Sequence, residues 1–236
     1  MVADCHYPGF FWLVRQDGKV KKEMIFVNFK TYQQGTGEQA LSLAKICAEV
    51  ASKTGLLIIP LVQTADIFRL ASQGFTVWAQ HVDGIDFGPH TGQTLPMAVL
   101  SAGAKGTLLN HAENKLSLEK IELIKQKCSG LQTLICAESL AEAKQIAVLK
   151  PDFLAYEPPE LIGGKISVSQ ARPEIISQFI EQFKEIPVLV GAGIHNQADV
   201  KKALELGARG ILVSSDVVLA DNPKQELFDL AGGFKQ

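Results

Sequence analysis

The chain has 236 residues, of which 47% are hydrophobic and 20% are charged, with 20 glycines and 10 prolines. This length and composition are typical of one large globular domain and exclude a collagen, a coiled coil or a disordered chain. Lys and Arg number 23 against 25 Asp and Glu, so the net charge of -2 excludes the broad basic field that recruits nucleic acid. We therefore expect no nucleic-acid partner, and any anionic ligand must be held by local groups.

Membrane insertion and secretion are not indicated by the apolar segments. The longest apolar stretch runs from Leu56 to Val62, whereas a membrane-spanning helix needs roughly 20 apolar residues. The chain start includes Asp4 and no basic residue, and charges follow the apolar run at Gly9 to Val14. A secretory signal would instead end in a small-residue cleavage site. We expect neither a membrane span nor a secretory signal.

The cysteines are scattered, with no CxxC pair and no histidine at a spacing typical of zinc sites. This pattern predicts neither a disulfide scaffold nor a metal site. Reduced thiols in a cytoplasmic protein are the simpler interpretation of Cys5, Cys47, Cys128 and Cys136.

Residues 1 to 23 precede the regular part of the chain, and we interpret them as a flexible N-terminal extension. The alternative is a hairpin, because Phe10 to Arg15 and Lys19 to Val27 flank Asp17-Gly18, a favoured two-residue turn. The aromatic residues of such a hairpin would need a surface to cover them. Residues 24 to 236 are expected to form one catalytic domain.

Beyond residue 23, short β-branched runs alternate with longer amphipathic stretches, which is typical of repeated βα units. The predicted strands are nearly continuously apolar, as expected for parallel strands that are buried on both faces. They are Ile25 to Asn28, Leu56 to Leu61, Val77 to His81, Gly106 to Leu109, Thr133 to Cys136, Phe153 to Tyr156, Pro187 to Gly191 and Ile211 to Ser214.

The stretches between these strands carry apolar residues at helical spacing. In Ala198 to Leu206, for example, Val200 and Ala203 share one face, and Gly207 supplies a C-terminal cap. Eight such βα units favour an α/β fold, a single (β/α)8 barrel, over an open doubly wound sheet. Other predicted helices are Glu38 to Ser52, Ser117 to Lys127, Leu140 to Leu149 and Arg172 to Phe183.

A (β/α)8 barrel collects the residues at the carboxyl ends of its strands at one mouth. Six of the predicted strands end in polar, charged or glycine residues, so the active site is expected there. These ends are Asn28-Phe29-Lys30, Gln80-His81, Asn110-His111-Ala112-Glu113, Glu157, Gly191-Ala192-Gly193 and Ser214-Ser215.

Three side chains of this set are candidates for the chemistry. Glu157 precedes two prolines that restrict its backbone, beside a glycine-rich stretch expected to act as a lid, which suits a general base. His111 can polarise a carbonyl or shuttle protons as an uncharged imidazole. Lys30 can supply the positive charge that an anionic substrate needs. The alternatives are a surface ion pair for Glu157, a hydrogen-bonded histidine without catalytic duty and a solvated loop lysine.

The last two predicted strands end in small residues whose backbone N–H groups suit a phosphate. Glycine after a strand is also common turn chemistry, so each residue alone is weak evidence. The candidates are Gly191, Gly193, Ser214 and Ser215.

Six motifs, taken together and in order, resemble triosephosphate isomerases of the archaeal type. The most specific is YEPPELIG, which follows the sixth predicted strand. The resemblance runs from Met24 to about Gly232, and its motifs are VNFKTY, QHVDGIDFGPHTGQT, GTLLNHAEN, YEPPELIGGKISVS, VGAGI and GILVSSDVV.

The resemblance implies an enzyme that interconverts dihydroxyacetone phosphate and D-glyceraldehyde 3-phosphate through an enediolate, with no cofactor and no metal. Glu157 would move the proton between two carbons, and His111 would be the electrophile. Asn28 and Lys30 would contact the substrate, and Glu113 would support the site by pairing near Lys30. The residues whose backbone N–H groups would hold the phosphate are Lys165, Gly193 and Ser215.

The resemblance also implies an oligomer. The stretch from Val82 to Thr94 has no predicted regular structure, which in a compact domain indicates a functional loop. It would be the intersubunit loop, with Thr91 reaching the neighbouring subunit's site. A homodimer or homotetramer follows, and the alternative is a surface loop on a monomer.

Three residues depart from the family pattern. Ala112 replaces a serine, and Lys165 replaces a glycine at the tip of the lid. Asp216 stands where glycine is usual, so its carboxylate would compete with phosphate if it faced the site or form a harmless cap if it turned outward. These departures support a second hypothesis, a barrel that binds a phosphorylated ligand with weak or no turnover. A different phosphosugar-handling barrel is a third, but it gives no account of YEPPELIG.

Overall fold

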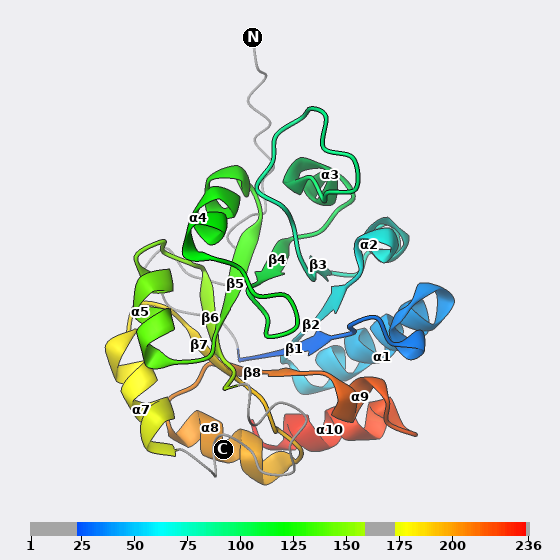
Figure 1. The fold of residues 1–236 in the computed structure, drawn as a ribbon. Helices are drawn as coiled ribbons and strands as arrows, with labels where there is room; N and C mark the ends of the chain where they lie inside the picture. Colours follow the sequence, from blue (N-terminus) through cyan, green and yellow to red (C-terminus); the bar gives the residue numbers. More distant parts are fainter. Residues whose placement is uncertain (1–22, 159–172, 235–236) are drawn as a thin grey trace.

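The structure is a computed structural model that describes residues 23–158 and 173–234. Eight parallel strands pair in chain order, and the last pairs with the first to close a barrel (Figure 1). This closure confirms the predicted (β/α)8 barrel and excludes the open sheet. The strands are β1 (Met24–Asn28), β2 (Leu57–Val62), β3 (Trp78–Ala79), β4 (Gly106–Leu109), β5 (Gln132–Ala137), β6 (Phe153–Tyr156), β7 (Val188–Gly191) and β8 (Gly210–Val213).

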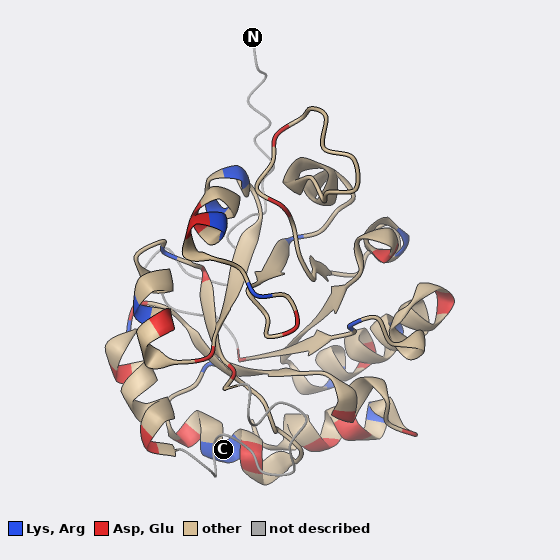
Figure 2. Cartoon of the chain, viewed as in Figure 1, with Lys and Arg blue, Asp and Glu red and all other residues tan. Residues whose placement is uncertain are grey.

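Helices surround the barrel, and Figure 2 shows charged residues of both signs spread over them while the strands carry few. None of the helices in the described ranges is long and apolar enough to cross a membrane. Residues 1–22 of the extension expected at residues 1–23 lie outside these ranges, as does the first strand of the alternative hairpin. The helices are α1 (Gly37–Thr54), α2 (Thr64–Ala71), α3 (Pro96–Ser101), α4 (Leu118–Lys127), α5 (Leu140–Ala147), α7 (Pro173–Gln182), α8 (Gln197–Glu205), α9 (Ser215–Val218) and α10 (Pro223–Gly232), with a 3-10 turn, η1, at Gln33–Gly35.

Each strand is buried on both faces, which explains why the predicted strands read as unbroken apolar runs. On β1, Ile25 and Val27 belong to the core between the sheet and the helices. Met24 and Phe26 belong to a second core that is built from strand residues alone and fills the barrel. The alternation of side chains along a strand thus supplies two cores at once.

Aromatic rings fill the barrel interior. The Phe26 ring lies edge-on to Trp78 with centroids 4.9 Å apart, and Phe153 lies 6.0 Å from Phe26 and 5.9 Å from Trp78. A Cβ at Gly106 would stand 2.5 Å from the Trp78 ring, so the indole occupies the space of a side chain on β4. The interior is packed and is not a channel, which leaves the mouth as the place for a substrate.

The third strand is shorter than predicted, because the chain leaves the sheet at Gln80. The Gln80 N–H still donates to the Val62 carbonyl at 3.2 Å, but its side chain turns toward the loop after β1. The following residues, 82–94, contain neither helix nor strand, as predicted, and extend beyond α3 in Figure 1. Two hydrogen bonds between Asp83 and Thr94 join the ends of this loop.

Candidate active site

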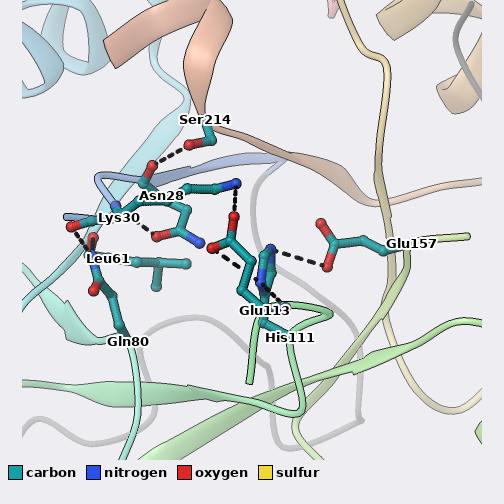
Figure 3. A network of polar contacts seen from close by, with 8 residues as sticks. All are labelled: Asn28, Lys30, Leu61, Gln80, His111, Glu113, Glu157 and Ser214. Carbon is teal, nitrogen blue, oxygen red and sulfur yellow. Dashed lines mark hydrogen bonds and ion pairs between the residues drawn. The ribbon is translucent and has the colours of Figure 1, made fainter. Parts of the chain in front are cut away.

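The carboxyl ends of the strands bring the expected polar side chains to one mouth of the barrel (Figure 3). Asn28 ends β1, His111 lies two residues beyond β4, Glu157 follows β6 directly and Ser214 follows β8. The side chains of Asn28, His111 and Glu157 are buried, unlike most polar residues of a protein. A substrate bound at this mouth would therefore meet groups that are largely shielded from water.

His111 and Glu157 point toward one another in Figure 3, with 3.8 Å between Nε2 of the imidazole and Oε2 of the carboxylate. On the other side of the ring, the backbone N–H of Glu113 donates to Nδ1 at 3.2 Å. Because Nδ1 accepts this hydrogen bond, the proton of the uncharged ring lies on Nε2. The ring thus presents an N–H donor to the space beside Glu157.

Asn110 fixes the backbone that carries His111. Its φ of 59° lies in the left-handed region, which asparagine tolerates better than most residues. Its side-chain amide donates to the Cys136 carbonyl at 2.9 Å, and its side-chain oxygen accepts from the Leu116 N–H at 2.9 Å. These bonds hold the turn after β4 against β5.

The Glu157 side chain lies between β5 and β7. A Cβ at Gly191 would stand 2.5 Å from Cγ and 2.7 Å from Oε1 of Glu157, so the absence of a side chain at Gly191 gives the carboxylate its space. Burial and the Glu157 carboxylate raise the pKa of the Cys136 thiol well above its usual range, so that thiol stays protonated. Oε2 is buried, and among the described residues no group donates a hydrogen bond to it, so the described part of the site leaves this acceptor unsatisfied.

Lys30 has a strained backbone, with φ at 48°, and neighbours on both sides hold it. Its N–H donates to Oδ1 of Asn28 at 3.0 Å. The side-chain amide of Gln80 donates to the Lys30 carbonyl at 2.9 Å and to the Leu61 carbonyl at 3.1 Å. Gln80 is therefore part of the site, although the sequence indicated only that a polar residue ends the third strand.

The Lys30 ammonium forms an ion pair with Oε1 of Glu113 at 2.7 Å, and the lysine side chain is only 15% exposed. Oε2 of Glu113 lies 3.7 Å from Nδ1 of His111. Glu113 thus links the lysine to the histidine.

The residues after β7 and β8 lie at the end of the mouth expected to bind phosphate. Two left-handed residues, Ala192 and Gly193, turn the chain after β7. The Ser214 hydroxyl donates to the Asn28 carbonyl at 2.7 Å, so it joins β8 to β1. Ser215 begins α9, and the first N–H groups of a helix have no partner within it.

The Asp216 carboxylate does not cap α9, and the contact that it makes is with a histidine. Its Oδ1 lies 2.8 Å from Nδ1 of His195, a residue in the loop after β7. No side chain caps α9, because the Ser214 hydroxyl at the N-cap is directed to β1. The carboxylate is therefore engaged by a histidine, a contact that sequence spacing gave no reason to expect.

Other expected residues lie outside this network. Lys165, the lid and YEPPELIG beyond Pro158 fall outside the described residues. Thr91 is exposed on the 82–94 loop and makes none of the contacts drawn in Figure 3. Within residues 23–158 and 173–234, no three His, Cys, Asp or Glu residues group as they would around a metal ion.

The family model for triosephosphate isomerase matches residues 23–230 of the chain. The chain belongs to the triosephosphate isomerase family. The triosephosphate isomerase of Methanobacterium bryantii is 45% identical over 214 residues, which cover 88% of this chain and 95% of that protein. The enzyme of Methanopyrus kandleri is 44% identical over 220 residues, or 89% of this chain and 97% of that protein.

A solved structure of triosephosphate isomerase from Bartonella henselae has the same fold, with a TM-score of 0.68 and 21% identity. It covers 89% of this chain and 97% of its own. Membership of the triosephosphate isomerase family confirms the resemblance drawn from the six motifs and identifies the chain as an isomerase. It does not favour the second hypothesis of a barrel that binds a phosphorylated ligand without turnover.

Proposed function

We propose that the chain interconverts dihydroxyacetone phosphate and D-glyceraldehyde 3-phosphate, with Glu157 as the base and His111 as the electrophile. The observation that carries the proposal is the facing pair at the mouth, a buried carboxylate 3.8 Å from an imidazole Nε2. The two groups come from β6 and β4, so a substrate between them would meet a base on one side and a hydrogen-bond donor on the other.

The chemistry follows from these positions. Glu157 removes the proton from the carbon next to the carbonyl, and the electron pair moves onto the carbonyl oxygen. The Nε2–H of His111 donates to that oxygen, and the Lys30 cation lowers the energy of the negative charge that develops on it. The hydroxyl proton on the first carbon then passes through His111 to the former carbonyl oxygen, and Glu157 returns its proton to the neighbouring carbon, so the new carbonyl forms on the first carbon. Burial of the site keeps water from the enediolate, which otherwise can expel phosphate.

Backbone N–H groups near Lys165, Gly193 and Ser215 are proposed to hold the phosphate, and no cofactor or metal takes part. The contacts of two other candidates support different roles. Gly191 lies against Glu157, and the Ser214 hydroxyl binds the Asn28 carbonyl. We assign both residues to positioning the site.

We also propose that the chain acts in the cytoplasm, in glycolysis and gluconeogenesis, as a homodimer or homotetramer. The 82–94 loop, which extends beyond α3, would form the intersubunit contact through Thr91. Phe87 on this loop is 79% exposed, and such a side chain is commonly covered in an assembly. Residues 1–23 would form an extension outside the catalytic domain.

Steady-state conversion of glyceraldehyde 3-phosphate by the purified chain tests the proposal. Glu157→Gln keeps the size of the side chain and removes the base, so kcat should fall by at least about 10²-fold. The matched control is Glu122→Gln, the same change on an exposed residue of α4, which should leave kcat unchanged. An inactive wild-type chain would favour the ligand-binding hypothesis, and an active Glu157→Gln variant would exclude Glu157 as the base.

A further inference from the structure

A second group of titratable side chains lies beside the proposed phosphate site and takes no part in the proton transfer. His195 follows β7, Asp216 lies in α9 and Glu226 lies in α10. Nδ1 of His195 and Oδ1 of Asp216 are 2.8 Å apart, a charge-assisted hydrogen bond of near-ideal length. This bond joins the two segments that are proposed to hold the phosphate.

Both ends of the His195–Asp216 bond are fixed by the fold. The His195 N–H donates to Oδ2 of Asp199, a buried residue in the first turn of α8, at 3.1 Å. On the other side, the N–H groups of Val217 and Val218 donate to the Ser214 carbonyl and hold α9 in place. The imidazole therefore determines where the Asp216 carboxylate points.

The Asp216 carboxylate would oppose phosphate binding if it were free to turn toward the first N–H groups of α9. A carboxylate in the first turn of a helix interacts favourably with the N–H groups that open the helix, and these are the groups a phosphate would use. Its charge also repels a phosphate dianion. The surroundings are acidic already, because burial, Asp216 and Asp229 raise the pKa of Glu226, whereas His195 lowers it.

We propose that His195 is a positioning residue for phosphate binding, which holds the Asp216 carboxylate away from the N–H groups of α9 through the hydrogen bond at 2.8 Å. The ligand concerned is a phosphate monoester dianion, and the inference rests on the proposed function. It explains how a phosphate site stays usable with an aspartate in the first turn of α9.

A pair of variants tests this inference through KM. His195→Ala frees the carboxylate, so KM for glyceraldehyde 3-phosphate should rise about tenfold, with a much smaller change in kcat. Adding Asp216→Gly to His195→Ala should return KM to the wild-type value or below it. A histidine with a merely structural role would not be rescued when its partner is removed, so a KM that stays high in the double variant overturns the proposal.

Two further variants separate charge from packing. His195→Asn keeps a donor near the position of Nδ1, so its KM should stay close to the wild-type value even if His195→Ala folds poorly. His195→Ala with Asp229→Asn removes a negative charge from α10 instead of α9 and should keep the raised KM. A raised KM in His195→Asn, or full rescue by Asp229→Asn, contradicts the role assigned to the hydrogen bond.

Calorimetric titration with inorganic phosphate gives a readout that does not depend on turnover. Phosphate affinity should fall about tenfold in His195→Ala and recover in the double variant with Asp216→Gly. If the wild-type chain binds phosphate in this pattern but does not turn over substrate, the proposed function fails and this inference stands. Equal phosphate affinity in the wild-type chain and His195→Ala overturns the inference.

Discussion

At the scale of single residues, several residues of the site act by holding another side chain in place. Gly191 leaves space for Glu157, Asn110 holds the turn that carries His111, and Glu113 links that histidine to Lys30. The reacting groups are few, and their neighbours determine the distances between them. Rates of this kind of chemistry are sensitive to displacements of about 1 Å.

Gly191→Ala should lower kcat by about 10²-fold, because the new Cβ would stand 2.5 Å from Cγ of Glu157 and displace the base. KM should change little, since the phosphate groups are untouched. Steady-state kinetics measure both values. Gly232→Ala is the matched control, because its Cβ meets only the flexible end of Gln197. An unchanged kcat in Gly191→Ala would show that Glu157 is not confined by β7.

At the scale of elements, the loop after β1 is held by three other strands. Ser214 after β8 binds the Asn28 carbonyl, while Gln80 after β3 binds the carbonyls of Lys30 and Leu61. Leu61 belongs to β2 and also accepts from the Phe29 N–H at 3.0 Å. The strained Lys30 therefore depends on the closed order of strands and not on its own sequence neighbours alone.

Gln80→Met keeps the size of the side chain but removes both hydrogen bonds to the carbonyls, so Lys30 should relax from its left-handed conformation. We expect kcat/KM to fall about tenfold, and we expect no further loss when Gln80→Met is added to Lys30→Ala. A double-mutant cycle on kcat/KM measures this. Gln73→Met on the surface, where the side chain donates to the Arg69 carbonyl, is the control. Additive losses in the cycle would contradict a role through Lys30.

At the scale of the whole molecule, the core of strand residues inside the barrel packs beneath the carboxyl ends of the strands, where the site lies. Its aromatic centre is built from β1, β3 and β6, two of which also carry groups of the site, Asn28 on β1 and Glu157 after β6. Loss of a large side chain there leaves a cavity that a closed barrel has little freedom to fill.

Phe153→Ala should lower the free energy of unfolding by about 3–5 kcal/mol, because the ring is fully buried among Phe26 and Trp78. Phe68→Ala removes the same kind of ring from an exposed position of α2 and should change the free energy of unfolding by less than about 0.5 kcal/mol. Urea denaturation at one fixed protein concentration measures both. Equal losses would show that the barrel interior does not dominate stability.

The sequence predicted positions in the fold better than contacts between distant residues. The strands were predictable because both of their faces are apolar, and the boundaries of Gly106–Leu109 and Phe153–Tyr156 are confirmed without change. Glu157, His111 and Lys30 were candidates because polar residues end the strands. The partners of Gln80 and His195 were not predictable, because each bond joins loops that are distant in sequence and become neighbours only when their strands pair in the sheet.

The hydrogen bond from Ser214 to the Asn28 carbonyl joins residues 186 positions apart in the chain. Next to this bond, β8 pairs with β1 along the edge of β1 that does not face β2. A nascent chain on the ribosome holds Asn28 and Lys30 long before it holds Ser214, so these residues lack this support until β8 and Ser214 have been made. Each newly made copy of the protein therefore lacks a complete site until β8 has been synthesised and has paired with β1, so activity that appears during synthesis would report this pairing.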